Sequence, residues 1–244
     1  MLLYGKNSVF ERVKANPASI KNIFLEEKFS QPQLESLIRA KRIPFKYVSL
    51  KQLQKIKRAD LLQGIVAEVE EFKYADFLDL TRESSGKLTF LILDRVYDPQ
   101  NLGAIMRTAA CSGGFAVVIP KHRACEVTET VLHVAQGGEN FVPVVRATNI
   151  TNILLEAKKD GYWVAGSVIE AGRSLDEVSF PFPLCFVLGS EGSGIRYGIQ
   201  KHLDLKVNIP MEGAPLSFNV ATSSAVFCYE ISRQRRRLGQ NKGL

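Results

Sequence analysis

The pattern of apolar residues changes about one third of the way along the chain. Up to about residue 70, short strand-like and helix-like segments follow one another, from "GKNSVFERVKA" and "IKNIFLE" to "QPQLESLIRAK" and "QGIVAEVEEF". From residue 88 onward the strand-like segments become nearly continuous apolar runs, namely "LTFLILD", "FAVVIP", "FVPVVRA", "YWVAGSVI", "PLCFVLG" and "DLKVNIP". Such runs, separated by helical stretches such as "NILLEAKKDG", are typical of a parallel sheet that is covered on both faces.

The sequence therefore predicts an α/β protein with two parts. A small α/β module is expected over residues 1–72 and a larger, mainly parallel α/β domain over residues 88–244. Between them, residues 73–87 have few apolar side chains and contain "SSG", so this segment is interpreted as a linker. Ligands of parallel sheets bind beyond the carboxyl ends of the strands, so the informative residues should follow the apolar runs.

Composition narrows the class of protein. No apolar run reaches the roughly 18 residues that a membrane-spanning helix needs, and the apolar part of the N-terminus is too short for a signal peptide. The four cysteines contain no C-x-x-C pair and the three histidines lack metal-ligand spacing, so neither a disulfide framework nor a metal site is expected. A cytoplasmic protein without a membrane partner fits these features best.

The net charge of +7 is concentrated in two places. Residues 39–58 carry eight Lys or Arg and no acidic residue, and a second group of cations lies near the C-terminus, around "RQRRR". Nucleic-acid contact and a merely solvated helical face both remain open for the first group.

Three strand ends carry unusual polar sequence: "DRVYDPQNLGAIMRTA", "VLGSEGSGI" and "IPMEGAPLSFNVA". Simple structural explanations exist for each, namely a capped helix with a surface arginine, a tight glycine turn, and Ser217 as a helix N-cap. The glycine spacing is G-x-x-G-x-G rather than G-x-G-x-x-G, which disfavours a dinucleotide-binding dehydrogenase. Three such loops at the ends of buried strands together favour a functional site.

Together these loops resemble the three motifs of the SpoU branch of the SPOUT RNA methyltransferases, which methylate ribose 2′-hydroxyls. The first motif matches Asp94 through Ala109, the second matches "VLGSEGSGI" and the third matches Ile209 through Ala221. The family usually has Leu where this chain has Phe218, and a small-residue run where this chain has "AQGG". The leading module resembles the L30e-like substrate domain of the ribosomal RNA members.

The resemblance implies an α/β-knot catalytic domain with a trefoil knot, S-adenosylmethionine as methyl donor, no metal, and a homodimer whose interface completes the site. Arg107 is implied to act at the 2′-hydroxyl, either as a general base or as a cation that stabilises the developing alkoxide. The implied catalytic residues are Arg107, Asn101, Glu191, Ser217 and Asn219. The implied cofactor-binding residues are Leu188, Gly189, Ile209, Met211, Phe218 and Asn219.

The implied substrate is a guanosine ribose of 23S, or large-subunit, ribosomal RNA. Arg39, Lys41, Arg42, Lys46 and Arg107 are the expected RNA-binding residues. A transfer RNA ribose methyltransferase is the main alternative, although such enzymes usually lack the leading module. A catalytically inactive RNA-binding or ribosome assembly factor of the same fold is the alternative from another class.

Overall fold

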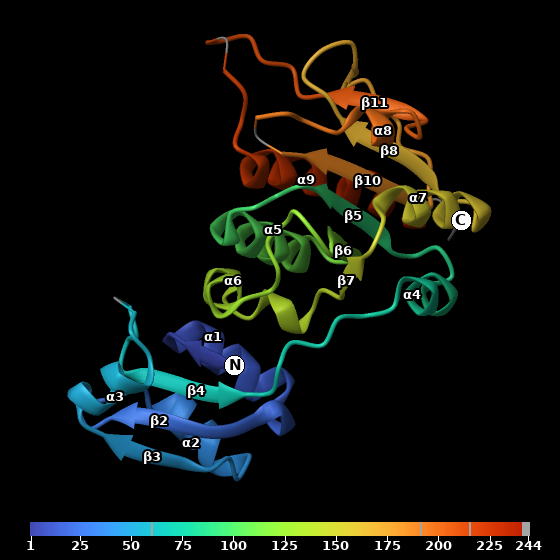
Figure 1. The fold of residues 1–244 in the computed structure, drawn as a ribbon. Coiled ribbons are helices and arrows are strands. Elements are labelled where there is room, and N and C mark those ends of the chain that lie inside the picture. Colours follow the sequence, from blue (N-terminus) through green and yellow to red (C-terminus); the bar gives the residue numbers. More distant parts are fainter. Residues whose placement is uncertain (60, 191, 215, 241–244) are drawn as a thin grey trace.

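The computed structural model describes residues 1–59, 61–190, 192–214 and 216–240. They form two sheets, a four-stranded one with the order β1-β4-β2-β3 and a seven-stranded one with the order β7-β6-β5-β10-β8-β11-β9. In Figure 1 the smaller sheet lies at the lower left, and the larger sheet extends above it.

The four-stranded sheet has helices on both faces. Apolar side chains of α1 and α2 join one core with Ile23 and Leu25, whereas Leu53 of α3 packs on the opposite face with Val66. Pro32 opens α2, and a reciprocal Ser49–Gln52 capping box opens α3. The elements are β1 (Leu2–Tyr4), α1 (Lys6–Ala15), η1 (Pro17–Ser19), β2 (Ile20–Glu26), α2 (Pro32–Ala40), β3 (Phe45–Val48), α3 (Leu50–Ile56) and β4 (Ile65–Val69).

Within the described residues, all neighbouring strands of the seven-stranded sheet pair in parallel, which confirms the predicted fold class. Its strands are β5 (Thr89–Asp94), β6 (Phe115–Pro120), β7 (Val144–Ala147), β8 (Trp163–Ser167), β9 (Arg173–Ser174), β10 (Leu184–Gly189) and β11 (Leu205–Asn208). Its helices are α4 (Phe77–Ser84), α5 (Pro99–Ser112), α6 (Glu129–Ala135), η2 (Gly138–Asn140), α7 (Ile150–Lys159), α8 (Tyr197–Gln200) and α9 (Val220–Gln240).

Burial on both faces explains why the central strands show no alternation. Leu91 and Leu93 of β5 belong to the core that contains α5, α6 and α9, whereas Phe90 and Ile92 belong to the core that contains α4 and α7. Because successive side chains of a strand point to opposite faces, both sets must be apolar.

Residues 73–87, interpreted from the sequence as a linker, contain helix α4 and an isolated parallel bridge between Ala75 and Val145. Asp76 caps this helix by accepting from the backbone N–H groups of Leu78 and Asp79. Phe77 then packs its ring on Phe90, with the ring centroids 4.7 Å apart. The segment therefore has its own local structure and covers part of the larger sheet.

Helix α6 and η2 join the two parts of the chain. The His133 ring stacks on Tyr4 with the centroids 4.2 Å apart, and Glu129 accepts hydrogen bonds from Leu2 N and Lys57 Nζ. Burial opposes the charge of Glu129, but these hydrogen bonds outweigh it and hold the pKa of the carboxyl below its usual value. Contacts between charged and aromatic groups therefore fix the module against the larger domain.

Candidate functional site

The three polar loops begin at the carboxyl edge of the larger sheet, where they follow β5, β10 and β11. Asp94, the last residue of β5, lies opposite Gly189, the last residue of β10, in the parallel register. Strand β8 follows on the other side of β10, and β11 follows β8. The strand order therefore gathers the residues that follow the apolar runs, as the sequence predicts.

The loops enclose a cavity of about 390 Å³, here called the first cavity. Six of its lining residues were predicted as site residues from the sequence: Leu188, Gly189, Ile209, Met211, Ser217 and Phe218. Ser167, the last residue of β8, and residues 168–170, which follow this strand, also line it and were not predicted. Their position at the carboxyl end of the apolar run "YWVAGSVI", which covers residues 162–169, was the signal that could have identified them.

Gly189 allows the loop after β10 to fold back on itself. A Cβ atom at this position would lie 2.1 Å from the carbonyl carbon of Gly194 and 2.2 Å from Ile195 N. The return is closed by a hydrogen bond of 2.9 Å from Gly194 N to Ser190 O, and Gly194 has a positive φ of 60°. This backbone crossing accounts for glycine at position 189, because any other side chain would displace the loop that walls the first cavity.

A buried ion pair fixes the same loop over the end of β5. The fully buried Asp94 accepts from Arg196 N at 2.9 Å and from Arg196 Nε at 2.8 Å, and its Oδ1 also lies 2.8 Å from Nη2. Arg196 was not predicted as a site residue, although a carboxylate at the end of an otherwise apolar strand signals the need for a cationic partner.

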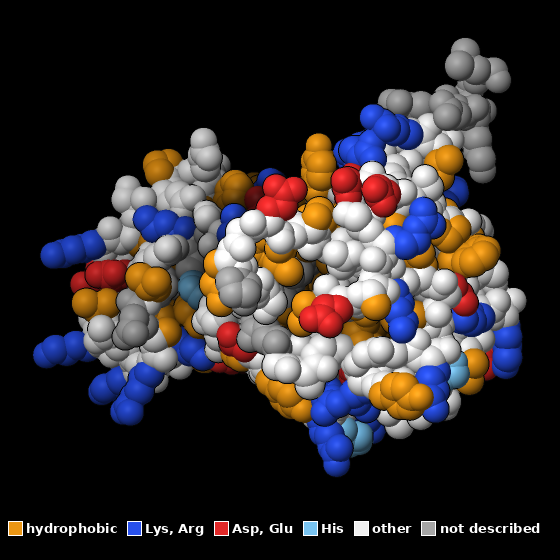
Figure 2. Space-filling view, turned by 90° about the horizontal axis from the view of Figure 1, so that it is seen from above, with side chains coloured by type: hydrophobic (Ala, Val, Ile, Leu, Met, Phe, Trp, Pro, Cys, Tyr) orange, Lys and Arg blue, Asp and Glu red, His pale blue; other side chains and the backbone are white. Residues whose placement is uncertain are grey.

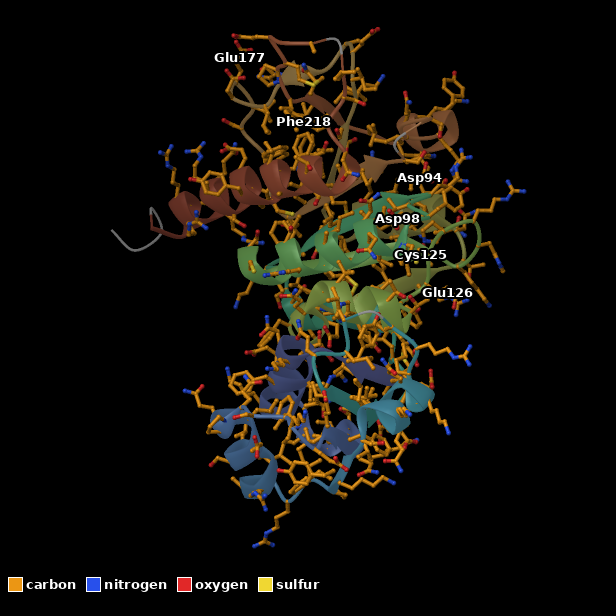
Figure 3. The ribbon with its side chains drawn as sticks, turned by 90° about the vertical axis from the view of Figure 1, so that its left-hand side faces the viewer. Asp94, Asp98, Cys125, Glu126, Glu177 and Phe218 are labelled. Carbon is orange, nitrogen blue, oxygen red and sulfur yellow. The ribbon has the colours of Figure 1, made fainter. Side chains whose placement is uncertain are left out.

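The first and third loops meet through two asparagines. Asn219 Nδ2 donates to Asn101 Oδ1 at 3.1 Å, and Asn219 Oδ1 accepts from Ala221 N at 2.8 Å. Asn219, rather than Ser217, therefore caps the start of α9. Asn101 lies in the first turn of α5, where Asp98 accepts from Gln100 N at 2.9 Å. Figure 3 shows Asp94 and Asp98 on the same side of the domain.

A second cavity, also of about 390 Å³, adjoins the first. The two share four lining residues, Ser190, Gly192, Ser193 and Val220. The second cavity is completed by Arg95, Val96, Tyr97, Asp98 and Asn101.

The structure does not bring Arg107 to either cavity. Arg107 lies six residues after Asn101 on α5, so the two side chains leave the helix about 120° apart. Its side chain is exposed, its backbone packs against Gly138, and it forms no ion pair within the described residues. Glu191, the remaining predicted catalytic residue, lies outside the described residues.

The cations of the leading module remain on its surface. Arg39, Lys41, Arg42 and Lys46, here called the basic patch, are all exposed. Arg39 also lies over the Phe45 ring and Lys46 over the Phe24 ring, each 4.9 Å from the centroid. Figure 2 shows Lys and Arg side chains projecting at the end of the molecule where the smaller sheet lies. Lys57, from the same run of cations, instead pairs with Glu129.

Comparison with known proteins identifies the family. Residues 88–229 match the model of the SpoU rRNA Methylase family, and residues 2–75 match a model for RNA 2′-O ribose methyltransferase substrate binding. The chain belongs to the SpoU methylase family.

Relatives of this family match along almost the whole chain. A putative TrmH family tRNA/rRNA methyltransferase of Bacillus subtilis is 35% identical, over 97% of this chain and 96% of the relative. A 23S rRNA (guanosine-2′-O-)-methyltransferase of Coxiella burnetii is 34% identical, over 96% of this chain and 95% of the relative. The crystal structure of the SpoU methyltransferase AviRb from Streptomyces viridochromogenes, in complex with AdoMet, shares the fold, with a TM-score of 0.80 at 22% identity and coverage of 97% and 91%.

The first cavity of this SpoU methylase chain suits a nucleoside-type methyl donor. Its wall combines apolar side chains, Leu188, Ile209, Met211 and Phe218, with the closely approaching backbone at Gly189. Such walls hold an adenine ring by contact and leave backbone groups to bind its polar edge. Within the described ranges, no three His, Cys, Asp or Glu side chains gather in a way that could hold a metal ion.

Two of the four free cysteines, Cys185 and Cys228, are buried. Burial raises the pKa of Cys185 and that of Cys228, the latter to about 12, so neither thiol is a nucleophile at neutral pH.

Among the residues that the structure describes, no helix has the length and apolarity to cross a membrane.

Proposed function

We propose that this chain transfers a methyl group from S-adenosylmethionine to a ribose 2′-hydroxyl of RNA, and that its substrate is a guanosine of 23S ribosomal RNA. The observation that carries the proposal is the contact between Asn101 and Asn219. This hydrogen bond joins the first and third family motifs. Asn219 lies between Phe218 and Val220, which both line the first cavity. The matched substrate-binding module and the name of the Coxiella burnetii relative support the choice of ribosomal RNA.

The first cavity is assigned to the methyl donor, with Leu188, Gly189, Ile209, Met211 and Phe218 as its binding residues. The donor supplies a methyl group that is already activated on a sulfonium. The protein has then to position the ribose and to assist loss of the hydroxyl proton as the new O–C bond forms. Ser217, Asn219 and Asn101 provide the polar groups near the donor, and Glu191 keeps its proposed role on motif position alone.

Arg107 is proposed to act across a homodimer. Its exposed side chain lies away from both cavities of its own chain. Exposed apolar side chains around the start of α9 supply a surface that a second copy would cover: Leu216, Phe218, Val226 and Tyr229. In this arrangement Arg107 of one chain reaches the cavities of the partner subunit.

The proposed role of Arg107 is that of a cation that holds the RNA phosphate and stabilises the developing alkoxide. Free guanidinium loses its proton only far above neutral pH, which disfavours a general base. Arg107→Lys separates these roles. A cation role predicts partial activity with an unchanged pH profile, whereas a base role predicts a new dependence on pH near the titration of the lysine.

The proposed domain boundaries are those predicted from the apolar pattern of the sequence. Residues 1–72 form an RNA-binding module, residues 73–87 form a connecting segment and residues 88–244 form the catalytic domain. The insertion of β10 between β5 and β8 and the return of α9 onto α5 support a trefoil-knotted path. Four free cysteines support a reducing, cytoplasmic location.

The test is transfer of labelled methyl from S-adenosylmethionine to unmodified 23S ribosomal RNA and, separately, to unmodified bulk transfer RNA. Alkali-resistant 2′-O-methyl positions are then mapped. Labelling of one guanosine in 23S ribosomal RNA is the expected result. Labelling of transfer RNA alone would overturn the assigned substrate and keep the reaction. Failure with both RNAs and with an assembling large subunit would favour an inactive binding factor.

A further inference from the structure

The second cavity contains a cation without a counter-ion. Arg95 has a positive φ of 63°, and its buried Nε atom has no hydrogen-bond partner among the described residues. A left-handed backbone is strained for arginine, so the loop holds this side chain in place at a conformational cost. Within the described residues Arg95 has no ion pair, because the adjacent Asp94 binds Arg196 with both carboxylate oxygens.

An unstacked aromatic ring lies on the same wall. Tyr97 is 58% exposed, and within the described part of the chain its ring packs on no other aromatic ring. Exposed aromatic rings in a groove that also carries cations are the usual platforms on which unpaired bases stack. The loop over residues 95–98 therefore presents both a phosphate-binding and a base-binding group.

A cationic loop continues this surface outward. Lys121, His122 and Arg123 are exposed after β6, and Cys125 N in the same loop donates to Val96 O at 2.9 Å. Figure 3 shows Cys125 and Glu126 beside Asp98. Glu126 pairs with Arg146 and so leaves the charge of this loop uncompensated. An RNA strand that leaves the second cavity would meet positive charge on this side.

We propose that the second cavity binds the RNA nucleotide that accepts the methyl group, with its base stacked on Tyr97 and its phosphate on Arg95. The cavity of about 390 Å³ has the size of a small-molecule site. It shares Ser190, Gly192, Ser193 and Val220 with the first cavity, so a ribose in it lies next to the methyl donor. The RNA strand that flanks this nucleotide runs along residues 121–123. This inference rests on the proposed function and names the residues that select its acceptor nucleotide.

The experiment measures KM and kcat for methyl transfer to unmodified 23S ribosomal RNA, together with the Kd for S-adenosylmethionine by calorimetry. Tyr97→Ala should raise KM about tenfold, the size of one lost base–aromatic stack, with an unchanged donor Kd. Tyr97→Phe keeps the ring and should match the wild type. Tyr197→Ala is the matched control, because Tyr197 is 75% exposed and lines neither cavity.

Arg95→Asn tests the phosphate contact without new backbone strain, because asparagine tolerates a positive φ. This variant should raise KM. It should also reduce the slope of log RNA affinity against log salt by about one, the contribution of a single phosphate contact. A second measurement places 2-aminopurine at the mapped acceptor position of an RNA fragment, where stacking on Tyr97 should quench its fluorescence in the wild type and Tyr97→Phe but not in Tyr97→Ala.

Equal KM and equal quenching in wild type and Tyr97→Ala would overturn this inference and leave the proposed function standing. A donor Kd that weakens as much as KM rises would also overturn it, since the second cavity would then belong to the donor. A wild-type chain that transfers no methyl group to any RNA would overturn both.

Discussion

Arg12 Nη2 on α1 donates to Glu139 Oε1 in η2 at 3.1 Å, and this buried pair joins the leading module to the larger domain. The next residue back, Gly138, packs so closely on α5 that an added Cβ would lie 3.0 Å from Arg107 Cα. The orientation of the RNA-binding module is therefore fixed through η2 to the helix that carries Arg107.

Breaking this pair should destabilise the protein. Glu139→Ala leaves the Arg12 guanidinium buried without its counter-ion, and we expect a loss of about 3–5 kcal/mol in the free energy of unfolding. The double variant Arg12→Met with Glu139→Leu should recover most of that loss, because a packed apolar pair needs no charge compensation. Denaturant unfolding measures both. Glu156→Ala, which removes an exposed pair with Lys159, is the control and should change stability little.

The same carboxyl should give a pH-dependent stability. Burial raises the pKa of Glu139 although Arg12 opposes the shift, so the folded state holds the proton more tightly than the unfolded state. The corresponding stability is full below the unfolded pKa of about 4.3 and is lost as pH rises through the folded pKa. The stability of wild type relative to Glu139→Gln should therefore fall as the pH rises above about 4.3. A relative stability that increases with pH would contradict this assignment.

Gly189→Ala should abolish donor binding while the protein stays folded. The added methyl group would overlap the returning backbone at Gly194 and Ile195 and displace the wall of the first cavity. Calorimetric titration with S-adenosylmethionine measures the loss. Gly198→Ala, where an added Cβ meets nothing within 4 Å, is the matched control and should bind normally. Donor binding by Gly189→Ala at wild-type strength would show that this loop does not form the donor site.

Arg107→Ala should lose methyl transfer by at least about a hundredfold while donor affinity is kept, because an electrostatic contact to the reacting group is removed. If Arg107 acts across the dimer, mixing inactive Arg107→Ala chains with inactive Gly189→Ala chains should restore activity. Each mixed dimer then has one complete site, which gives about a quarter of the wild-type rate at equal mixing. No recovery in mixed dimers verified by mass would place Arg107 at the cavity of its own chain.

The basic patch should contribute to RNA affinity through counter-ion release. Changing Arg39, Lys41, Arg42 and Lys46 together to glutamine should reduce the slope of log affinity against log salt by about three. Filter binding over a range of salt concentrations measures it. Changing the exposed Lys87 and Lys159 to glutamine is the control for net charge. A slope equal to that of the wild type would place the RNA on another surface.

Local sequence was sufficient for most elements and for six residues that line the first cavity. The strand "IKNIFLE" matches β2 (Ile20–Glu26), and the continuous run "LTFLILD" matches β5, because burial on two faces demands apolar residues at every position. Short elements with few residues to show a period, such as β1, β9 and α8, were not predicted.

The sequence by itself determined the parallel sheet, the edge at which the loops gather and six residues of the first cavity, because these follow from hydrophobic periodicity and from motifs that are local in the chain. Only the tertiary structure decided that Asp94 binds Arg196, that Asn219 reaches Asn101, and that Arg12 is neutralised by Glu139. Each pair joins residues about a hundred or more positions apart, and strand order and helix rotation, which local patterns do not encode, set which side chains meet. The same helix rotation turns Arg107 away from the cavities, although the linear motif places this residue close to Asn101.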